Sequence, residues 1–332
     1  MSSVSAQPAQ HMQCMEVWSG SQLTARGVEL GGLDTWVYSK PYGQSEYGGD
    51  VYYASSCATG RISRLLLADV SGHGISVAAT ASELRTLMRR FVNRLDQNEF
   101  VRLLNQQFAA LSRNGSFATA IVTTFFAPSR RLTVCNAGHP RPLLYRSAQR
   151  QWDLLGHLES AAPCGRSNLP LGILHGSRYE QFDVQLEAGD CLVSYTDALI
   201  ESRDADGEML GEDGLLRLMR LLPDVAPEEL IETLLAEIAQ RYPENLSEDD
   251  VTVLVMRANG GEGHYSLSEK LGAFARFAVS LIRSINPKAE RAPFPDANLA
   301  NIGGAVIPAL GRRWRAPGAM RRGNPGDTKR SA

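Results

Sequence analysis

Apolar and polar positions follow two different periods along the chain, and these periods predict both strands and helices. Residues 61–70, RISRLLLADV, form an apolar run that predicts a buried strand. After a GHG turn, apolar residues recur at three- and four-residue steps over 75–113, which predicts two helical stretches with a core-facing stripe. Three more runs, at 117–127, 131–138 and 141–146, are separated by turn residues and predict the successive strands of a meander.

The pattern then changes from strands to helices and back. Residues 179–202 predict two strands around an EAGD turn, and helical patterns follow at 212–222 and 227–241. The segment DDVTVLVMR, at 249–257, predicts a closing strand that alternates between apolar and polar positions. Strands, a helix pair, strands, helices and a strand in this order favour an α+β layered fold over a regular βαβ repeat.

The composition changes after Arg257. A Gly-rich linker precedes residues 266–285, which predict a basic amphipathic helix, and an irregular Pro-, Gly- and Arg-containing tail follows. Residues 264–332 carry 12 Lys or Arg against 4 Asp or Glu, whereas the rest of the chain carries 22 against 32. We therefore expect an N-terminal extension (1–29), an acidic folded body (30–258), and a linker with a basic helix and tail (259–332).

The composition excludes several classes of protein. With 43% hydrophobic and 21% charged residues, the chain is typical of a globular protein. It has no apolar window near the roughly 18 residues of a membrane span and no signal-peptide pattern, so we expect a cytoplasmic location. The 5 cysteines are odd in number and widely spaced, which argues against a disulfide framework or a zinc site. An acidic body without a recognised nucleic-acid motif argues against nucleic-acid binding.

Four aspartates stand where apolar runs begin or end: Asp50, Asp69, Asp197 and Asp249. Each of them alone is most often a helix cap or a turn former. Together they form a set of hard oxygen ligands of the kind that Mg²⁺ and Mn²⁺ prefer. Glycines beside Asp50 and Asp69 leave the backbone open to whatever binds there. The sequence therefore predicts a site for a divalent cation.

Seven motifs carry a resemblance to a known family: GGDVYY, ADVSGHG, FATAIV, NAGHPRPLLY, LPLGIL, LEAGDCLVSYTDALIE and EDDVTVLV. Their order and approximate spacing resemble the bacterial SpoIIE-type branch of the PPM metal-dependent serine/threonine phosphatases. The resemblance covers residues 30–257 and implies that 30–258 is the phosphatase domain. It also implies a four-layer α-β-β-α sandwich, in which two antiparallel sheets are flanked by helices.

The resemblance implies a role for each aspartate at a site with two Mn²⁺ or Mg²⁺ ions. Asp50 resembles the carboxylate that bridges both metals. Asp69 resembles a ligand of one metal, assisted by the backbone carbonyl of Val70. Asp197 and Asp249 resemble the ligands of the other metal. The residues expected to be catalytic are Asp50, Asp69 and His73.

Three assignments stay open. Asp250 competes with Asp249 for the last metal position. His73, in the GHG turn, could protonate the leaving alkoxide or hydrogen-bond a water at the metals, or it could simply fix the turn. No arginine is assignable as a phosphate clamp, and four basic residues are interpreted as ordinary surface charges: Lys40, Arg61, Arg64 and Arg85.

The resemblance implies a phosphoserine/phosphothreonine protein phosphatase of bacterial signalling, in which water activated by the two metals attacks phosphorus in line. Similar proteins often act on small antagonist proteins of the anti-sigma-factor system, so a phosphoprotein of that kind is the expected substrate. The regulatory input is expected from a separate partner protein, from the tail or from oligomerisation. Two alternatives are a non-catalytic interaction module of the same fold and a metal-dependent hydrolase of a small phosphate ester. The basic tail could contact anionic lipid or dock onto the acidic body.

Overall fold

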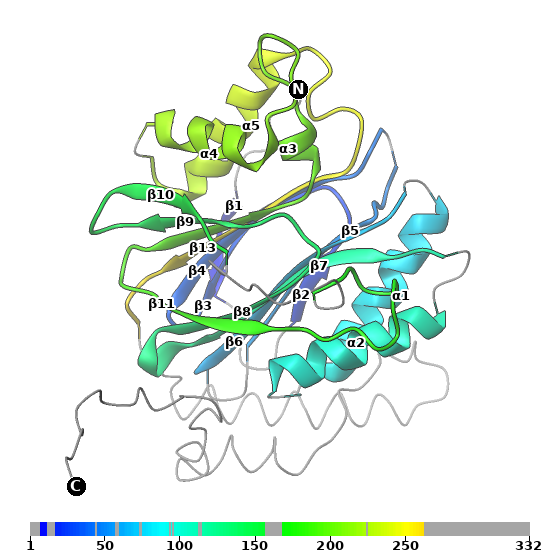
Figure 1. Ribbon diagram of the computed structural model, residues 1–332. Coiled ribbons are helices and arrows are strands. Elements are labelled where there is room, and N and C mark those ends of the chain that lie inside the picture. The colour runs from blue at the N-terminus through cyan, green and yellow to red at the C-terminus, as the bar shows by residue number, and fades with distance from the viewer. Residues whose placement is uncertain are drawn as a thin grey trace, which may run out of the picture. The chain divides into compact units, whose positions relative to one another are not determined.

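The computed structural model describes residues 7–11, 17–43, 45–56, 60–72, 75–92, 94, 96–111, 115–156, 168–223 and 225–261. Two β-sheets lie face to face, and helices cover the outer face of each sheet (Figure 1). This arrangement confirms the predicted α+β sandwich with four layers. The predicted amphipathic helix (266–285) and the basic tail lie outside the described residues.

The sheets differ in strand number. The seven-stranded sheet has the order β1 (Gln7–His11), β3 (Thr24–Leu30), β4 (Leu33–Lys40), β13 (Val251–Ala258), β12 (Cys191–Tyr195), β9 (Leu143–Arg146) and β10 (Gln151–Leu154). The six-stranded sheet has the order β11 (Gln181–Gln185), β8 (Arg131–Ala137), β7 (Ala118–Phe126), β6 (Ile62–Val70), β5 (Asp50–Ser56) and β2 (Val17–Gly20). Among the described strands, β1 and β3 pair in parallel and the other pairs are antiparallel.

Five α-helices are described, and they divide between the two sheets. The six-stranded sheet packs against α1 (Ile75–Phe91) and α2 (Gln97–Leu111). The seven-stranded sheet packs against α3 (Ala198–Glu201), α4 (Gly211–Leu221) and α5 (Pro227–Arg241). A 3₁₀ turn, η1 (Ala127–Ser129), joins β7 to β8. None of the described helices is long and apolar enough to cross a membrane.

Both faces of the central strands are buried. On β6, Leu65 and Leu67 face the core between the sheets, whereas Leu66 faces the core under α1 and α2. On β13, Leu254 lies between the sheets and Val255 lies under the helices. A strand covered on both faces reads as a continuous apolar run. The alternation predicted for the closing strand is therefore wrong.

The predicted meander is correct for β7 and β8 and wrong for β9. β9 pairs with β12 in the other sheet, so the chain changes sheet between β8 and β9. Gly138 stands at this change with a φ of +71°, and a Cβ there would lie 2.6 Å from Cγ of Pro170. Only glycine fits such a conformation in so small a space.

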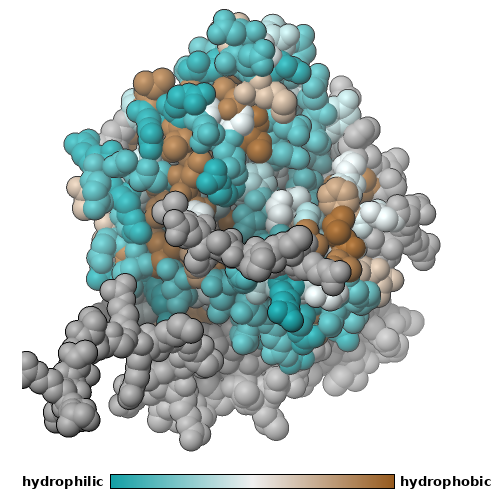
Figure 2. Space-filling model, viewed as in Figure 1, coloured by the Kyte–Doolittle hydropathy of each residue, from teal (hydrophilic) through white to brown (hydrophobic). Residues whose placement is uncertain are grey.

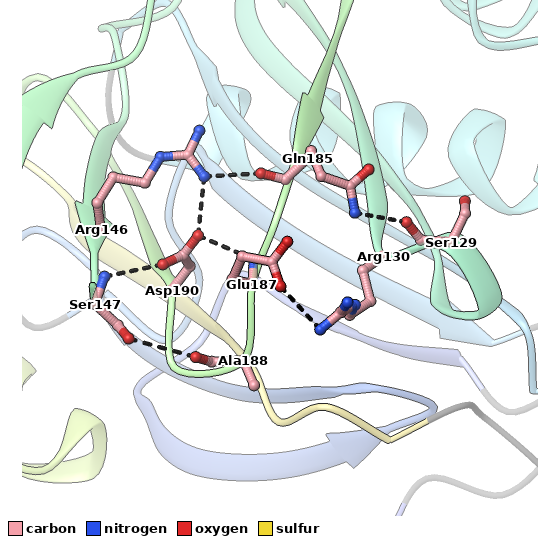
Figure 3. A network of polar contacts seen from close by, with 8 residues as sticks. All are labelled: Ser129, Arg130, Arg146, Ser147, Gln185, Glu187, Ala188 and Asp190. Atoms are coloured by element: carbon pink, nitrogen blue, oxygen red, sulfur yellow. Dashed lines mark hydrogen bonds and ion pairs between the residues drawn. The ribbon is translucent and has the colours of Figure 1, made fainter. Parts of the chain in front are cut away.

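A polar network ties the two sheets together at the start of β12 (Figure 3). Arg146, at the end of β9, donates to the Gln185 carbonyl at 2.7 Å and to Asp190 at 2.9 Å. The Asp190 carboxylate also accepts the backbone N–H of Ser147 and of Glu187. Because Asp190 is buried, these charge-assisted hydrogen bonds offset its loss of hydration.

A groove of about 800 Å³ lies beside this end of β12, between β10 and the connection from α4 to α5. Trp152 and Leu222 are among its lining residues, together with Cys191 and Arg257. Figure 2 shows apolar side chains (brown) gathered among polar ones (teal) on one face of the protein. Since Cys191 begins β12, the groove lies at the opposite end of that strand from Asp197 and is not the predicted metal site.

Residues 1–29, expected to be an extension, contain strands of both sheets. β2 pairs with β5, and β3 pairs with β4. β2 has only four residues, and β3 mixes apolar with polar residues, so the apolar periodicity of both is weak. The division of the chain at 30 and 258 stays a prediction.

The interpretation of Arg64 as a surface charge is wrong, because this side chain is buried. Its guanidinium donates to Thr124 Oγ1, to the Val92 carbonyl and to the Arg94 carbonyl, and it lies 4.5 Å from the centre of the Phe100 ring. Burial lowers the pKa of Arg64 to about 10, so it stays charged at neutral pH. Arg64 thus fastens the link between α1 and α2 to the six-stranded sheet.

Arg64→Met is expected to lower the free energy of unfolding by about 2–3 kcal/mol, because two backbone carbonyls lose a charged donor. Arg89→Met is the matched control: Arg89 is exposed on α1, so its loss should change stability by less than about 0.5 kcal/mol. Urea unfolding of both variants measures the difference. Equal stability of the two variants would contradict this role for Arg64.

Candidate metal centre

Asp50 and Asp69 lie opposite one another on neighbouring strands. Asp50 is the first residue of β5, and the register pairs it directly with Asp69 of β6. Directly opposed residues of an antiparallel pair point to the same face of the sheet. The next pair on that face is Tyr52 with Leu67, and both belong to the core between the sheets. Both carboxylates therefore point into the edge of the space between the sheets.

The other sheet brings the remaining aspartates to the same edge. Thr196 follows β12 and donates through Oγ1 to Asp50 Oδ2 at 2.9 Å, and Asp197 comes next as the N-cap residue of α3. Asp249 lies just before β13, which pairs antiparallel with β12. The structure thus brings together the ends of four strands that carry the four predicted aspartates.

The pKa values of these carboxylates reflect burial and mutual repulsion. Burial, followed by the charge of Asp69, raises the pKa of Asp50 well above its usual value. Burial raises the pKa of Asp69 to about 8, with further contributions from the charges of Asp197 and Asp249. Burial and the charges of Glu201 and Asp249 raise the pKa of Asp197 to about 6. A bound divalent cation would offset this crowding of negative charge.

Asp250 makes different contacts from Asp249. Its Oδ1 accepts the backbone N–H of Tyr42 at 2.6 Å, and its Oδ2 accepts that of Gly49 at 2.5 Å. A Cβ at Gly48 would lie 2.5 Å from Oδ1 of Asp250. The two glycines therefore make room for this carboxylate, which holds the 42–49 loop. Oδ1 of Asp249 accepts one backbone N–H, that of Asp250, at 2.8 Å. Asp249 therefore stays the expected metal ligand, with Asp250 as its competitor.

Asp250→Asn is expected to destabilise the protein by about 1–3 kcal/mol, since an amide NH₂ would face one of the two backbone N–H groups. Asp249→Asn should instead weaken Mn²⁺ binding more strongly than Asp250→Asn. Urea unfolding and calorimetric titration with Mn²⁺ measure the two effects. The reverse order of Mn²⁺ affinities would assign the metal position to Asp250.

Two other sequence expectations concern residues beside the aspartates. His73 lies outside the described residues. The Val70 carbonyl lies beside Gly49, where an added Cβ would approach its oxygen to 3.0 Å. Two polar residues were missed: Glu201, four residues after Asp197, could have been found from helical spacing, whereas no pattern marks Thr196.

The donor chemistry of this edge fits a hard divalent cation, because carboxylate and carbonyl oxygens are the atoms that such ions prefer. The side chains face one another across the two sheets, but in the part of the chain that the structure describes no three acidic, His or Cys side chains converge on a single point. The donor atoms of these residues are therefore of the type that binds a hard divalent cation.

A family model described as Stage II sporulation protein E (SpoIIE) matches residues 60–259, which is more than half of the chain. The chain belongs to the SpoIIE family. This confirms the resemblance seen in the motifs. The SpoIIE match includes Asp69, Asp197 and Asp249, whereas Asp50 lies before its first residue.

Two curated relatives of this SpoIIE-family chain come from Bacillus subtilis. The phosphoserine phosphatase RsbU is 24% identical over 194 residues, which cover 58% of this chain and 55% of RsbU. The phosphoserine phosphatase RsbP is 25% identical over 217 residues, which cover 64% of this chain and 49% of RsbP. The chain thus spans about half the length of these relatives.

A solved structure confirms the fold. The crystal structure of the RsbU and RsbW domains of a Mycobacterium tuberculosis protein superposes with a TM-score of 0.57 and 22% identity. The match covers 79% of this chain and 72% of that chain. At this identity the likeness shows the fold alone.

Proposed function

We propose that this chain is a metal-dependent phosphoserine/phosphothreonine protein phosphatase of bacterial signalling. The observation that carries the proposal is the group of mutually repelling aspartates at one edge of the two sheets, where Asp50 is buried and Asp69 and Asp197 are half-buried. Such an arrangement costs stability unless a cation binds, which is typical of a functional site. The names of RsbU and RsbP, both phosphoserine phosphatases, support the same activity.

Asp50, Asp69 with the Val70 carbonyl, Asp197 and Asp249 would hold two divalent cations, Mn²⁺ or Mg²⁺. When bound, these cations supply positive charge to the phosphoryl oxygens and a water-derived nucleophile at neutral pH. The protein orients the ligands: Thr196 holds one oxygen of Asp50, and Asp250 holds the 42–49 loop beside it. His73 would either protonate the leaving serine or threonine oxygen or fix the GHG turn.

The substrate that we propose is a phosphoprotein, with an antagonist protein of the anti-sigma-factor system as the first candidate. One structural relative carries an RsbU and an RsbW domain in the same protein, which supports a regulatory partner for phosphatases of this kind. Contact of the basic tail with lipid or with the acidic body stays a prediction, and so does the cytoplasmic location.

A substrate panel tests this function. We expect Mn²⁺-dependent phosphate release from phosphoserine and phosphothreonine peptides, with rates that change at least about tenfold when the flanking residues change. Free phosphoserine should be a poor substrate. Equal rates for free phosphoserine and all peptides would indicate the small-ester hydrolase instead. Binding of a phosphopeptide without turnover in Mn²⁺ or Mg²⁺ would indicate the non-catalytic module.

A further inference from the structure

Thr196 joins the two sheets at the candidate metal centre. It directly follows β12 of the seven-stranded sheet, and its side chain is fully buried. Its Oγ1 lies 2.9 Å from Oδ2 of Asp50, which begins β5 of the six-stranded sheet. This is a side-chain hydrogen bond from one sheet to a proposed metal ligand of the other.

The direction of this hydrogen bond is fixed by its surroundings. The backbone N–H of Thr252 donates to Thr196 Oγ1 at 3.0 Å, so one lone pair of the hydroxyl oxygen is already used. The single hydroxyl proton of Thr196 is donated to Asp50 Oδ2, and a carboxylate that is ionised, as a metal ligand is, can only accept. The competing contact from Thr196 Oγ1 to the Thr252 carbonyl is longer, at 3.5 Å.

Hydrogen bonds at the ends of β12, β13 and β4 hold Thr196 in place. The backbone N–H of Thr196 donates to the Thr252 carbonyl at 3.0 Å, which extends the pairing of β12 with β13 by one residue. The Thr252 hydroxyl lies 3.0 Å from Ser39 Oγ on β4, and both of these side chains are buried. Ser39 and Thr252 also face each other in the register of β4 and β13. Three strands thus fix the position from which Thr196 donates, and the Thr252 side chain also hydrogen-bonds the Asp50 carboxylate.

We propose that Thr196 is a positioning residue that sets the rotation of the Asp50 carboxylate and thereby aims its remaining lone pairs at the metal site. A carboxylate turns freely about its last single bond unless a hydrogen bond holds one oxygen. An oxygen that accepts one hydrogen bond keeps a second lone pair, so the contact with Thr196 is compatible with metal binding. Outer-shell hydrogen bonds of this kind orient metal ligands and typically change metal affinity 10–100-fold.

The test is a calorimetric titration of the purified full chain with Mn²⁺ at constant pH. Thr196→Val keeps the shape of the side chain and removes the hydroxyl, and we expect about 10–100-fold weaker Mn²⁺ binding. Thr196→Ser keeps the hydroxyl and should bind Mn²⁺ within about threefold of the wild type. Thr196→Ala takes the place of the Val variant if that variant does not fold.

Thr123→Val is the matched control. Thr123 is also a buried threonine, and its hydroxyl donates to the Leu65 carbonyl at 3.3 Å. It lies four residues along β7 from Thr119, the residue paired with Asp69, which is about 13 Å of strand. Its loss should leave Mn²⁺ affinity within about twofold of the wild type, because distant sites act independently.

The outcomes separate this inference from the proposed function on which it rests. Weaker Mn²⁺ binding by Thr196→Val, with recovery in Thr196→Ser and no change in Thr123→Val, supports the positioning role even if no phosphatase activity is found. Wild-type Mn²⁺ affinity in a folded Thr196→Val variant overturns the role and leaves the proposed function intact. A wild-type protein that binds no Mn²⁺ overturns both.

Discussion

Asp50→Asn is expected to reduce Mn²⁺-dependent phosphate release by at least about 10³-fold. Asp50 is buried, lies opposite Asp69, and accepts the hydroxyl of Thr196, so the asparagine would keep the shape of the side chain. What it would lose is one negative charge and one acceptor oxygen at the centre of the ligand set. Initial rates at saturating Mn²⁺ measure the effect.

The control for this variant is Asp153→Asn. Asp153 pairs with Arg220 at 2.8 Å, and its side chain is 54% exposed, so its loss should change the rate by less than about twofold. Asp50→Asn must also unfold cooperatively in urea, which separates lost chemistry from lost structure. A well-folded Asp50→Asn protein that keeps more than a tenth of the wild-type rate would remove Asp50 from the proposed site.

Asp69→Asn is expected to stabilise the metal-free protein at neutral pH while it abolishes Mn²⁺ binding. The pKa of Asp69 is about 8 in the folded protein and about 3.9 in an unfolded chain. Between these values the folded state binds one more proton, so stability falls as pH rises, by up to about 1.4 kcal/mol per pH unit. Asparagine cannot ionise, so the variant does not lose stability in this way. At pH 7 the free energy of unfolding of Asp69→Asn should exceed that of the wild type by about 2–4 kcal/mol.

Urea unfolding in the presence of a chelator, at pH 5 and at pH 7, measures this difference. The advantage of Asp69→Asn over the wild type should grow between the two pH values, and saturating Mn²⁺ should reverse it, because only the wild type gains binding energy. Asp153→Asn serves again as the control and should show no pH-dependent advantage. An advantage that is the same at both pH values would mean that Asp69 titrates as an ordinary surface carboxylate.

Strong periodic patterns predicted most of the fold. The strand at 61–70, the helix pair at 75–113 and the helices after residue 210 were found correctly, because each buries a wide apolar face. The place of β9 could not be read from the sequence, since pairing in one sheet or the other leaves the same apolar pattern. The strands before residue 60 were missed, and so was β10. β1, β2 and β10 have only four or five residues each, too few for a clear period. β3, β4 and β5 have seven or eight residues, and the patterns of β4 and β5 could have been found.

The candidate site was predictable in its charged residues and not in their supports. Aspartates at the ends of apolar runs are visible in the sequence, and the structure brings them to one edge. Adjacent aspartates at 249 and 250 look equivalent in a sequence, and only the backbone N–H groups of Tyr42 and Gly49 distinguish them. Thr196 acts across 146 residues of chain, which no local pattern can reveal.

The most direct test of metal-dependent phosphatase activity is the rate at which the purified full chain hydrolyses a generic aryl phosphate. This rate is measured against Mn²⁺ concentration and then with excess chelator. For a metal-dependent phosphatase we expect a rate that rises to saturation with Mn²⁺, falls to background with chelator and recovers when Mn²⁺ is restored. A folded protein that binds Mn²⁺ and shows no turnover, or one whose turnover ignores the chelator, would contradict a metal-dependent phosphatase.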